Sequence, residues 1–380
     1  MKKVILAFDS FKGSVNAKEI TDAIKSTIQK FQPDCEIVSF PIADGGEGTM
    51  EVLSDHLKAH KTSCLVHDPL MRIITSTYAF TKDGRTAIME MAAAAGLPLL
   101  TPEERNPLNT TTFGVGEMIK DALQKGCRHI LLGIGGSATN DAGIGMMNAL
   151  GVRFFDSDKK EIKPTGGLLS NIAYIDTSNL ISELKDTQFT IISDVNNPFC
   201  GPMGAAYVFA PQKGGNEEQI KLLDKGLYHY GKLILNKFGK DIFNIPGAGA
   251  AGGMGGGLIP YLNIEIRQGS KAILQILNFK ETLKDTSLIF TGEGKIDRQT
   301  TMGKALQGIV ELAKEADIPV IALGGAIEET EQLNKLGFTG VFSIQSGPVT
   351  LQDAMKKETA LNNLSRTVIQ IIRIADAFSK

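Results

Sequence analysis

Six loops of the chain are rich in polar side chains or in glycine, and most of them follow an apparent β-strand. These loops are residues 9–14, 43–49, 105–112, 133–141, 246–257 and 291–301. A glycine loop ahead of a helix binds phosphate readily, because no side chain blocks its backbone N–H groups and the helix dipole favours an anion. One such loop alone is usually a tight turn. A set of them in one chain favours a site for phosphate groups.

Charged side chains in and near these loops are of the kinds that phosphoryl transfer needs. That reaction uses cations on the phosphates, carboxylates for Mg²⁺ and an acceptor for the proton of the attacking hydroxyl. The available cations are Lys12, Arg105, Lys213 and Lys295, and the available carboxylates are Asp44, Glu47, Asp194, Glu293 and Asp297. Any one carboxylate could instead cap a helix or stabilise a loop, so the interpretation rests on the set.

The segment Gly133-Ile-Gly-Gly-Ser-Ala138 supports a different interpretation, because it matches the G-x-G-x-x-A fingerprint of dinucleotide-binding proteins. A strand precedes it, and Asp156 follows the next apparent strand. An NAD(P)-dependent dehydrogenase of a small hydroxy acid is therefore an alternative. Against it, the loop continues to Asp141 before helical periodicity begins, whereas the fingerprint needs a helix that opens directly on the pyrophosphate. A non-catalytic nucleotide sensor that uses the same loops is a further alternative.

Strands and helices that must position these loops alternate at both ends of the chain. Val4–Phe8 predicts a strand, and Asn16 with Glu19 predicts a capping box at the start of a helix. A strand over 36–42 and a helix to about residue 59 follow. Two β-loop-α units in succession predict parallel strands with polar loops at their carboxyl ends. The C-terminal part repeats this rhythm, with strands expected at 287–290, 319–323 and 340–344.

The middle of the chain breaks the rhythm. Residues 73–91 alternate with a period of two around a turn at 82–85, which predicts a hairpin, and residues 152–162 resemble another. Other expected elements are helices over 112–125 and from Asn216 to about 238, and strands at 129–132 and 189–193. Since both ends are regular, we expect an α/β protein of two domains. One comprises residues 1–70 plus 285–380, and the other, residues 71–284, is inserted within it.

The composition is that of an ordinary globular protein. At 380 residues the chain is roughly two to three times the size of a usual domain. A net charge of −2 gives no reason to expect nucleic acid or an anionic membrane as a partner, and no window approaches the apolar length of a membrane helix. The four cysteines form no C-x-x-C pair, which fits a reducing compartment. We therefore expect a cytoplasmic protein, with its oligomeric state left open.

Taken together and in order, the motifs resemble the bacterial glycerate kinase type-1 family over essentially the whole chain. The matching blocks are Asp9-Ser-Phe-Lys-Gly-Ser14, Pro41-Ile-Ala-Asp-Gly-Gly-Glu-Gly-Thr49, Arg105-Asn-Pro-Leu108, Gly133-Ile-Gly-Gly-Ser-Ala-Thr-Asn-Asp141, Phe209-Ala-Pro-Gln-Lys213, Pro246-Gly-Ala-Gly-Ala-Ala-Gly-Gly253 and Thr291-Gly-Glu-Gly-Lys-Ile-Asp297. Small departures from the pattern are Lys295 where arginine is expected, and Ala142 and Ala210 where glycine is usual.

The resemblance implies a fold and an activity. The expected fold is a Rossmann-like parallel-sheet domain built from both chain ends, with an inserted flavodoxin-like α/β domain. The expected activity is the phosphorylation of D-glycerate by ATP with Mg²⁺, which yields 2-phosphoglycerate and ADP. D-glycerate would be the small-molecule partner, with ATP and Mg²⁺ as cofactors.

A working hypothesis assigns a role to each candidate residue. The carboxylate of glycerate is held by Arg105 or Lys12, and either Asp194 or Asp297 orients or deprotonates the attacking hydroxyl. The full assignment is Asp194, Asp297 and Lys12 as catalytic residues; Ser10, Arg105, Asn140 and Asp141 as substrate-binding residues; Gly135, Gly136, Ser137, Lys213, Gly252, Gly253, Glu293 and Lys295 as nucleotide-binding residues; and Asp44 and Glu47 as Mg²⁺ ligands.

Overall fold

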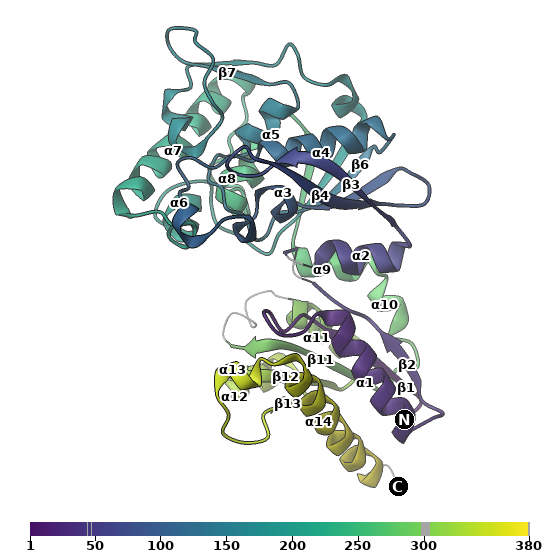
Figure 1. The fold of residues 1–380 in the computed structure, drawn as a ribbon. Coiled ribbons are helices and arrows are strands. Elements are labelled where there is room, and N and C mark those ends of the chain that lie inside the picture. Colours follow the sequence, from purple (N-terminus) through teal and green to yellow (C-terminus); the bar gives the residue numbers. More distant parts are fainter. Residues whose placement is uncertain (44, 47, 298–304, 379–380) are drawn as a thin grey trace. The chain divides into compact units, whose positions relative to one another are not determined.

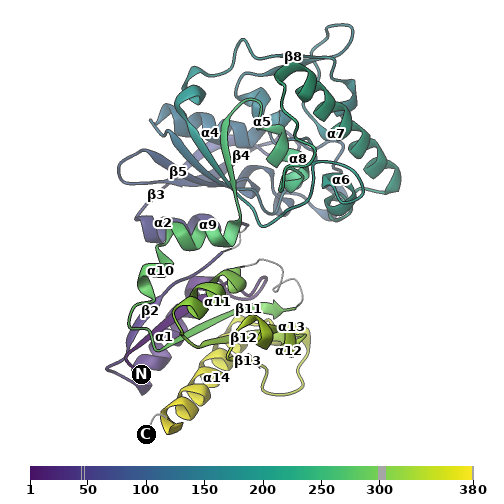
Figure 2. The same cartoon turned by 180° about the vertical axis from the view of Figure 1, so that it is seen from behind.

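The structure is a computed structural model that describes residues 1–43, 45–46, 48–297 and 305–378. The chain forms two compact units, shown from opposite sides in Figures 1 and 2. Unit 1 comprises residues 1–44 and 269–380, and unit 2 comprises residues 45–268. This confirms an α/β protein with one part built from both chain ends and another inserted between them. The compact units meet at residues 44/45 and 268/269. The predicted domain limits at residues 70 and 284 stay a prediction.

The strands are β1 (Lys3–Phe8), β2 (Glu36–Ser39), β3 (His60–His67), β4 (Ile73–Phe80), β5 (Thr86–Glu90), β6 (His129–Gly133), β7 (Arg153–Phe155), β8 (Tyr174–Asp176), β9 (Gln188–Ile192), β10 (Asn263–Arg267), β11 (Leu288–Ile296), β12 (Val320–Ile327) and β13 (Gly340–Ser343). The α-helices are α1 (Ala17–Phe31), α2 (Thr49–Leu57), α3 (Ala92–Ala95), α4 (Phe113–Gln124), α5 (Ile144–Ala149), α6 (Ala205–Phe209), α7 (Glu217–Phe238), α8 (Ala250–Gly257), α9 (Gly269–Ile276), α10 (Phe279–Thr282), α11 (Ala305–Glu315), α12 (Thr330–Leu336), α13 (Leu351–Ala354) and α14 (Lys357–Phe378). Short 3₁₀ helices occupy Leu97–Leu99, Pro102–Glu104, Gly166–Asn171, Ser182–Asp186 and Pro211–Lys213.

Unit 1 contains a parallel sheet with the strand order β13-β12-β11-β1-β2. Strand β1 pairs with β11 in a register that places Leu6 opposite Phe290. Alternate side chains of β1, among them Leu6 and Phe8, enter an apolar core with one face of α1 and of α14. These two helices lie side by side (Figure 1). The polar loops that follow β1, β11 and β12 therefore meet at one edge of the sheet.

The start of α1 agrees with the sequence prediction. The side chain of Asn16 accepts a hydrogen bond of 2.8 Å from the backbone N–H of Glu19, and the Glu19 carboxylate accepts one from the backbone N–H of Asn16. The expected capping box is thus confirmed, and it fixes the end of the loop 9–15 relative to the helix.

Unit 2 contains a six-stranded sheet with the order β10-β9-β6-β5-β4-β3. Strands β10, β9, β6 and β5 are parallel, while β5, β4 and β3 are joined by antiparallel pairing. The predicted hairpin over 73–91 is confirmed as β4 and β5. An apolar core lies between this sheet and buried faces of α4, α5 and α7.

The structure departs from the sequence predictions at four places. Residues 60–67 form the edge strand β3, which was not predicted. The expected hairpin over 152–162 is present as an antiparallel bridge between Phe155 and Glu161 with two flanking backbone hydrogen bonds, but its strand β7 also pairs with the distant β8, which was not predicted. The loop expected from residue 291 is strand β11 as far as Ile296. Part of the glycine segment 246–257 is the helix α8, which is kinked at residues 251–253.

Within the part of the chain that the structure describes, no helix combines the length and the apolar character needed to cross a bilayer.

Candidate active site

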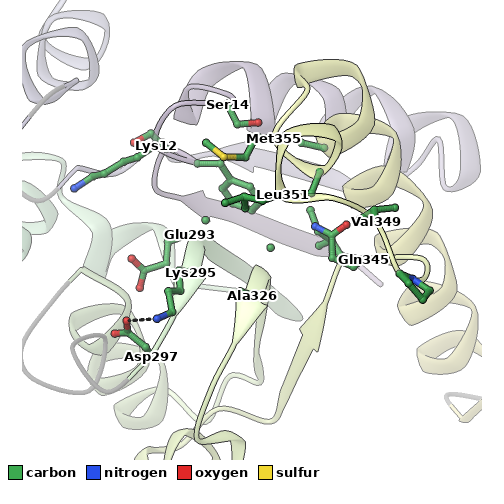
Figure 3. A pocket seen from close by; sticks show the side chains of 18 of the residues that line it. Lys12, Ser14, Glu293, Lys295, Asp297, Ala326, Gln345, Val349, Leu351 and Met355 are labelled. Atoms are coloured by element: carbon green, nitrogen blue, oxygen red, sulfur yellow. Dashed lines mark ion pairs between the residues drawn. The ribbon is translucent and has the colours of Figure 1, made fainter. Parts of the chain in front are cut away.

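Unit 1 has a pocket of about 680 Å³ at the carboxyl-end edge of its sheet. The loop after β1, the last part of β11, the end of β12 and residues 344–360 supply its walls (Figure 3). Open parallel sheets bind ligands outside the carboxyl ends of their strands. Among the predicted site residues, those brought together here are Ser10, Lys12, Glu293, Lys295 and Asp297.

Charged groups occupy one side of this pocket, and apolar side chains occupy the other (Figure 3). The ammonium nitrogen of Lys295 lies 3.4 Å from an oxygen of Asp297 and 3.0 Å from an oxygen of Glu328. The hydrogen bond that Lys295 donates to Glu328 is the main cause of a pKa of Lys295 above its usual value, and Asp297 adds to it. The charge of Lys295 is therefore shared between two carboxylates. Both carboxylates favour the protonated form of Lys295.

Ser10 is held by its neighbour at the start of the same loop. Its backbone N–H donates a hydrogen bond of 2.6 Å to the carboxylate of Asp9, which is buried. The loop returns through a bridge between Phe11 and Val15. This tight turn carries Lys12 at its exposed tip, so the turn brings a cation to the wall of the pocket.

Unit 2 gathers most of the other predicted residues around the loop 133–141. The centre of this group is Lys213, which is only 1% exposed. Its ammonium nitrogen donates hydrogen bonds to the hydroxyl oxygen of Ser137, at 2.7 Å, and to the backbone carbonyl of Thr139, at 2.5 Å. Burial lowers the pKa of Lys213 to about 7, and the negative charge of Asp141 offsets part of that decrease. Lys213 thus fixes the shape of the loop by joining two points on it.

Asp141 organises the other end of the loop. Its carboxylate is fully buried and accepts hydrogen bonds from the backbone N–H and the hydroxyl of Thr112, both at 2.8 Å, and from the N–H groups of Gly143 and Gly145. Desolvation raises the pKa of Asp141, while these donors act in the opposite direction. The carboxylate therefore ties the starts of α4 and α5 together. Because its carboxylate accepts hydrogen bonds from Thr112, Gly143 and Gly145 of the protein itself, the geometry supports a role for Asp141 in positioning the loop.

Asn140, between these two anchored residues, is fully buried. Both polar atoms of its carboxamide have no hydrogen-bond partner among the residues that the structure describes. Leaving such a group unpaired costs free energy, and polar groups left unpaired in a fold often belong to a binding site. This observation is consistent with the predicted substrate-binding role of Asn140.

The glycines of the loop are needed for close approaches of backbone to backbone. A Cβ on Gly135 would lie 2.6 Å from the Cα of Gly46, and a Cβ on Gly133 would lie 2.8 Å from the carbonyl oxygen of Gly45. Gly136 has a φ of +71°, which favours glycine. The backbone at Gly45 and Gly46 is therefore packed directly against the loop 133–141, as the glycine content of both segments permits.

Gly252 and Gly253 pack in the same way against the far side of the loop. Both have positive φ, and a Cβ on Gly252 would lie 2.2 Å from the carbonyl oxygen of Thr139. The carbonyl of Gly252 also accepts a hydrogen bond of 3.0 Å from the N–H of Ala142. These contacts give the two glycines a packing function, and the structure places neither against an open surface.

Arg105 and Asp194 lie on separate segments of unit 2. The backbone of Arg105 is adjacent to Gly214, because a Cβ on that glycine would lie 2.2 Å from the Arg105 carbonyl oxygen. Arg105 is thus next to the segment that carries Lys213. Asp194 is partly buried and follows β9 at its carboxyl end. Asp297, the other predicted acid–base residue, belongs to unit 1.

The two predicted Mg²⁺ ligands, Asp44 and Glu47, lie outside the described residues. Across the described ranges there is no group of three or more His, Cys, Asp or Glu side chains placed to hold a metal ion. Mg²⁺ in kinases commonly uses only one or two carboxylates together with phosphate oxygens. Glu293 and Asp297, which line one pocket, are of the kind that fits this requirement.

The dinucleotide interpretation of residues 133–138 loses its geometric basis. Helix α5 begins only at Ile144, so no helix opens directly on the glycine loop. Asp156 accepts hydrogen bonds from the backbone N–H groups of Asp158 and Lys160, at 3.0 and 2.9 Å. It stabilises a turn, as an Asx motif does.

The sequence reasoning did not single out the apolar side of the unit 1 pocket. Val349, Leu351 and Met355 supply this wall, and Gln345 and Ser14 are polar residues beside it. The signal in the sequence is the set of apolar residues interspersed among polar ones in the segment after β13.

Comparison with known proteins gives a consistent result. A family model described as the glycerate kinase family matches residues 4–376. A glycerate kinase of Bacillus cereus is 44% identical over 373 residues, 98% of this chain and 97% of that protein. A glycerate 2-kinase of Escherichia coli is 40% identical over 365 residues, 96% of this chain and 95% of that protein. A crystal structure described as a glycerate kinase 2 of Salmonella typhimurium LT2 is 38% identical with a TM-score of 0.88, covering 100% of this chain and 99% of that one.

Proposed function

The chain belongs to the glycerate kinase family, and we propose that it transfers the terminal phosphoryl group of ATP, bound with Mg²⁺, to the 2-hydroxyl of D-glycerate. The observation that carries this proposal is the family match across almost the entire chain. We choose the 2-hydroxyl as the acceptor because the Escherichia coli relative is named a glycerate 2-kinase. A kinase also needs cations, carboxylates and a proton acceptor in its loops, and both units supply such groups.

The pocket of unit 1 supports the phosphate part of the proposal. Lys12 contributes a cation at an exposed position, and Glu293 and Asp297 contribute carboxylates at the same sheet edge. These carboxylates would hold Mg²⁺, which neutralises charge on the phosphate oxygens when it is bound. Lys295 holds Asp297 in place through their ion pair of 3.4 Å.

The loop 133–141 of unit 2 supports the acceptor part. Lys213 and Asp141 hold the loop from both ends, and Asn140 lies between them with an unpaired carboxamide in the described chain. An amide can donate to a carboxylate and accept from a hydroxyl, which are the two kinds of group that glycerate carries. We therefore assign Asn140 to the acceptor and Lys213 and Asp141 to its positioning.

Either Asp194 or Asp297 would accept the proton from the attacking hydroxyl. Both are partly buried and follow a strand, which is where a parallel sheet presents catalytic groups. A general base and a metal ligand respond differently to added Mg²⁺, so kinetics of the two single variants can separate these roles.

A coupled assay of ADP release tests the proposed function. The purified chain should release ADP from Mg-ATP only when D-glycerate is present, and phosphorus NMR of the product should show the 2-phosphate. L-glycerate and glycerol are matched controls that change the configuration or remove the carboxylate. Nucleotide binding without glycerate-dependent ADP release would identify a sensor, and reduction of NAD(P)⁺ by the hydroxy acid would identify a dehydrogenase. Either result would exclude the kinase.

A further inference from the structure

We propose that the apolar side of the unit 1 pocket binds the adenine base of the nucleotide, and that Gln345 recognises the edge of that base. The inference rests on the proposed function for the identity of the nucleotide, and it deepens that function by assigning a base site. None of the residues of this apolar side was a predicted site residue.

The first observation is the exposure of three apolar side chains in one short segment. Val349, Leu351 and Met355 are 47%, 76% and 38% exposed, and all three line the pocket. Figure 3 shows them on the side away from Glu293 and Lys295. An exposed apolar wall of this kind loses contact with water when a flat aromatic ring lies against it.

The second observation is a pair of unsatisfied polar atoms beside the same wall. The side-chain oxygens Oε1 of Gln345 and Oγ of Ser14 are buried, and neither has a hydrogen-bond partner within the described chain. A ligand that supplies donors to these oxygens would relieve the cost of leaving them unpaired. The exocyclic amine of adenine is such a donor, and a carboxamide can pair with the adjacent ring nitrogen as well.

The third observation is the shape of the pocket between its two sides. The residues that line it between these sides include Gly294 and Gly325, which carry no side chain. The lining is therefore bare backbone at this point, which allows a flat ligand to approach closely. The total volume, about 680 Å³, is within the range of roughly 300–1,000 Å³ that holds a small ligand.

One molecule fits these features because it is aromatic at one end and polyanionic at the other. With the base on the apolar side, the phosphates extend toward Lys12 and the carboxylates that would hold Mg²⁺. A wholly apolar ligand would leave Gln345 and the charged side unused. A bare polyphosphate would leave the apolar wall unused.

A fluorescence experiment tests the base site directly, because the chain contains no tryptophan. The variant Leu351→Trp places a single emitter on the apolar wall, at a position exposed enough to accept it. The control Ile374→Trp places the same emitter on α14 of the same unit, where the side chain is 58% exposed and does not line the pocket. ADP should quench the first emitter with saturation and leave the second unchanged, while inorganic triphosphate should quench neither.

The role of Gln345 is tested by Gln345→Ala, with Gln332→Ala on α12 as the matched control. Loss of a hydrogen bond to the base should raise the Kd for ADP and the KM for ATP by roughly three- to tenfold. The KM for glycerate, the Kd for triphosphate and the values in the control should change by less than about twofold. A change in the KM for glycerate instead, or an equal change for triphosphate, would overturn the assignment.

The failure of this inference differs from the failure of the proposed function. Glycerate-dependent ADP release with no quenching of Leu351→Trp by saturating ADP would leave the kinase intact and remove the base site. If the emission of Leu351→Trp falls as the protein concentration rises without any nucleotide, a second copy of the chain covers the apolar wall. That result would also overturn the proposal. Saturable quenching by ADP without any phosphoryl transfer would support the base site and exclude the kinase activity.

Discussion

The ammonium nitrogen of Lys213 lies 2.7 Å from the hydroxyl oxygen of Ser137, and both side chains are buried. A buried cation is stable only when polar groups replace the water that it has lost. The hydroxyl of Ser137 is one of those groups, so the pair connects the end of a 3₁₀ helix to the glycine loop. The shape of the loop should therefore depend on both residues together.

A double-mutant cycle of Lys213→Met and Ser137→Ala should reveal this dependence. Below pH 7, where Lys213 is protonated, we expect a coupling of about 1.5–3 kcal/mol in the free energy of unfolding, since the hydrogen bond is buried and one partner carries charge. Urea titration of the four proteins measures it. The exposed pair Lys280 and Glu315, whose atoms are 2.9 Å apart, is the control and should show little coupling. Additive effects at Lys213 and Ser137 would contradict the prediction.

The stability of the protein should rise with pH because of Lys213. Burial lowers the pKa of its amine to about 7 from the ordinary 10.5, so between these values the unfolded chain binds more protons than the folded one. The free energy of unfolding then increases with pH across this window, and the contribution is constant below pH 7, where both states are protonated. The unfolding free energy of the wild type minus that of Lys213→Met should therefore increase from pH 7 to pH 9. A constant difference would show that the pKa of the amine is not shifted.

Replacing Asp141 by asparagine should destabilise unit 2 strongly. Thr112 and Gly145 donate to one carboxylate oxygen and Gly143 donates to the other, so the amide keeps only one of these acceptors and turns its NH₂ group toward the N–H groups on the other side, in a fully buried site. We expect a loss of about 3 kcal/mol in thermal or urea unfolding. Asp156→Asn, in an exposed turn with two similar bonds, should cost less than about 1 kcal/mol. Equal losses would show that the burial of Asp141 is unimportant.

Two glycines with nearly the same backbone conformation should respond differently to alanine. Gly252 and Gly239 have φ values of +70° and +67°. A Cβ on Gly239 would have no heavy atom of the described residues within 4 Å beyond its immediate neighbours in the chain, whereas a Cβ on Gly252 would meet the Thr139 carbonyl oxygen at 2.2 Å. Gly239→Ala should cost about 1 kcal/mol for its left-handed conformation, and Gly252→Ala should cost at least about 3 kcal/mol or prevent folding. Thermal unfolding compares the two.

The two candidate proton acceptors can be separated by their response to Mg²⁺. If Asp194 or Asp297 is the general base, its change to asparagine should lower kcat by about 10²–10⁴, with no recovery at high Mg²⁺. A residue that holds the metal should instead raise the Mg²⁺ concentration needed for half-maximal activity. Steady-state kinetics with D-glycerate at several Mg²⁺ concentrations, with thermal unfolding as a folding control, distinguishes these outcomes. Unchanged turnover in both variants would remove both assignments.

The sequence predicted local elements well where the signal is short-range. The capping box of Asn16 and Glu19, and the hairpin of β4 and β5, depend on residues that are close along the chain. Strand β3 was missed because residues 60–67 are mostly polar and exposed, as an edge strand permits. The pairing of β7 with β8 joins segments far apart in sequence, which no local pattern reports.

Glycine is hard to interpret from the sequence, because this one residue type serves several structural purposes. Gly292 looked like the start of a loop, yet it lies in β11 where a Cβ would come within 2.0 Å of the Leu323 carbonyl oxygen. Gly252 is packed against Thr139, and its predicted nucleotide-binding role stays a prediction. Ala142 stands where the family usually has glycine, and its φ is +53°. A positive φ favours glycine, which explains why glycine is usual at this position. The hydrogen bonds of Lys213 and Asp141 required the fold itself.

The position of β1 in the middle of its sheet has a consequence for synthesis on the ribosome. β1 emerges first, but its partner β11 begins only at Leu288, after the whole of unit 2. Unit 2 can bury its own core before β11 has been synthesised and can pair with β1. Leu6 and Phe8 can pack early against α1, but the part of their core that comes from β11 and α14 is missing until late in translation, and a chain that stops early leaves that side exposed.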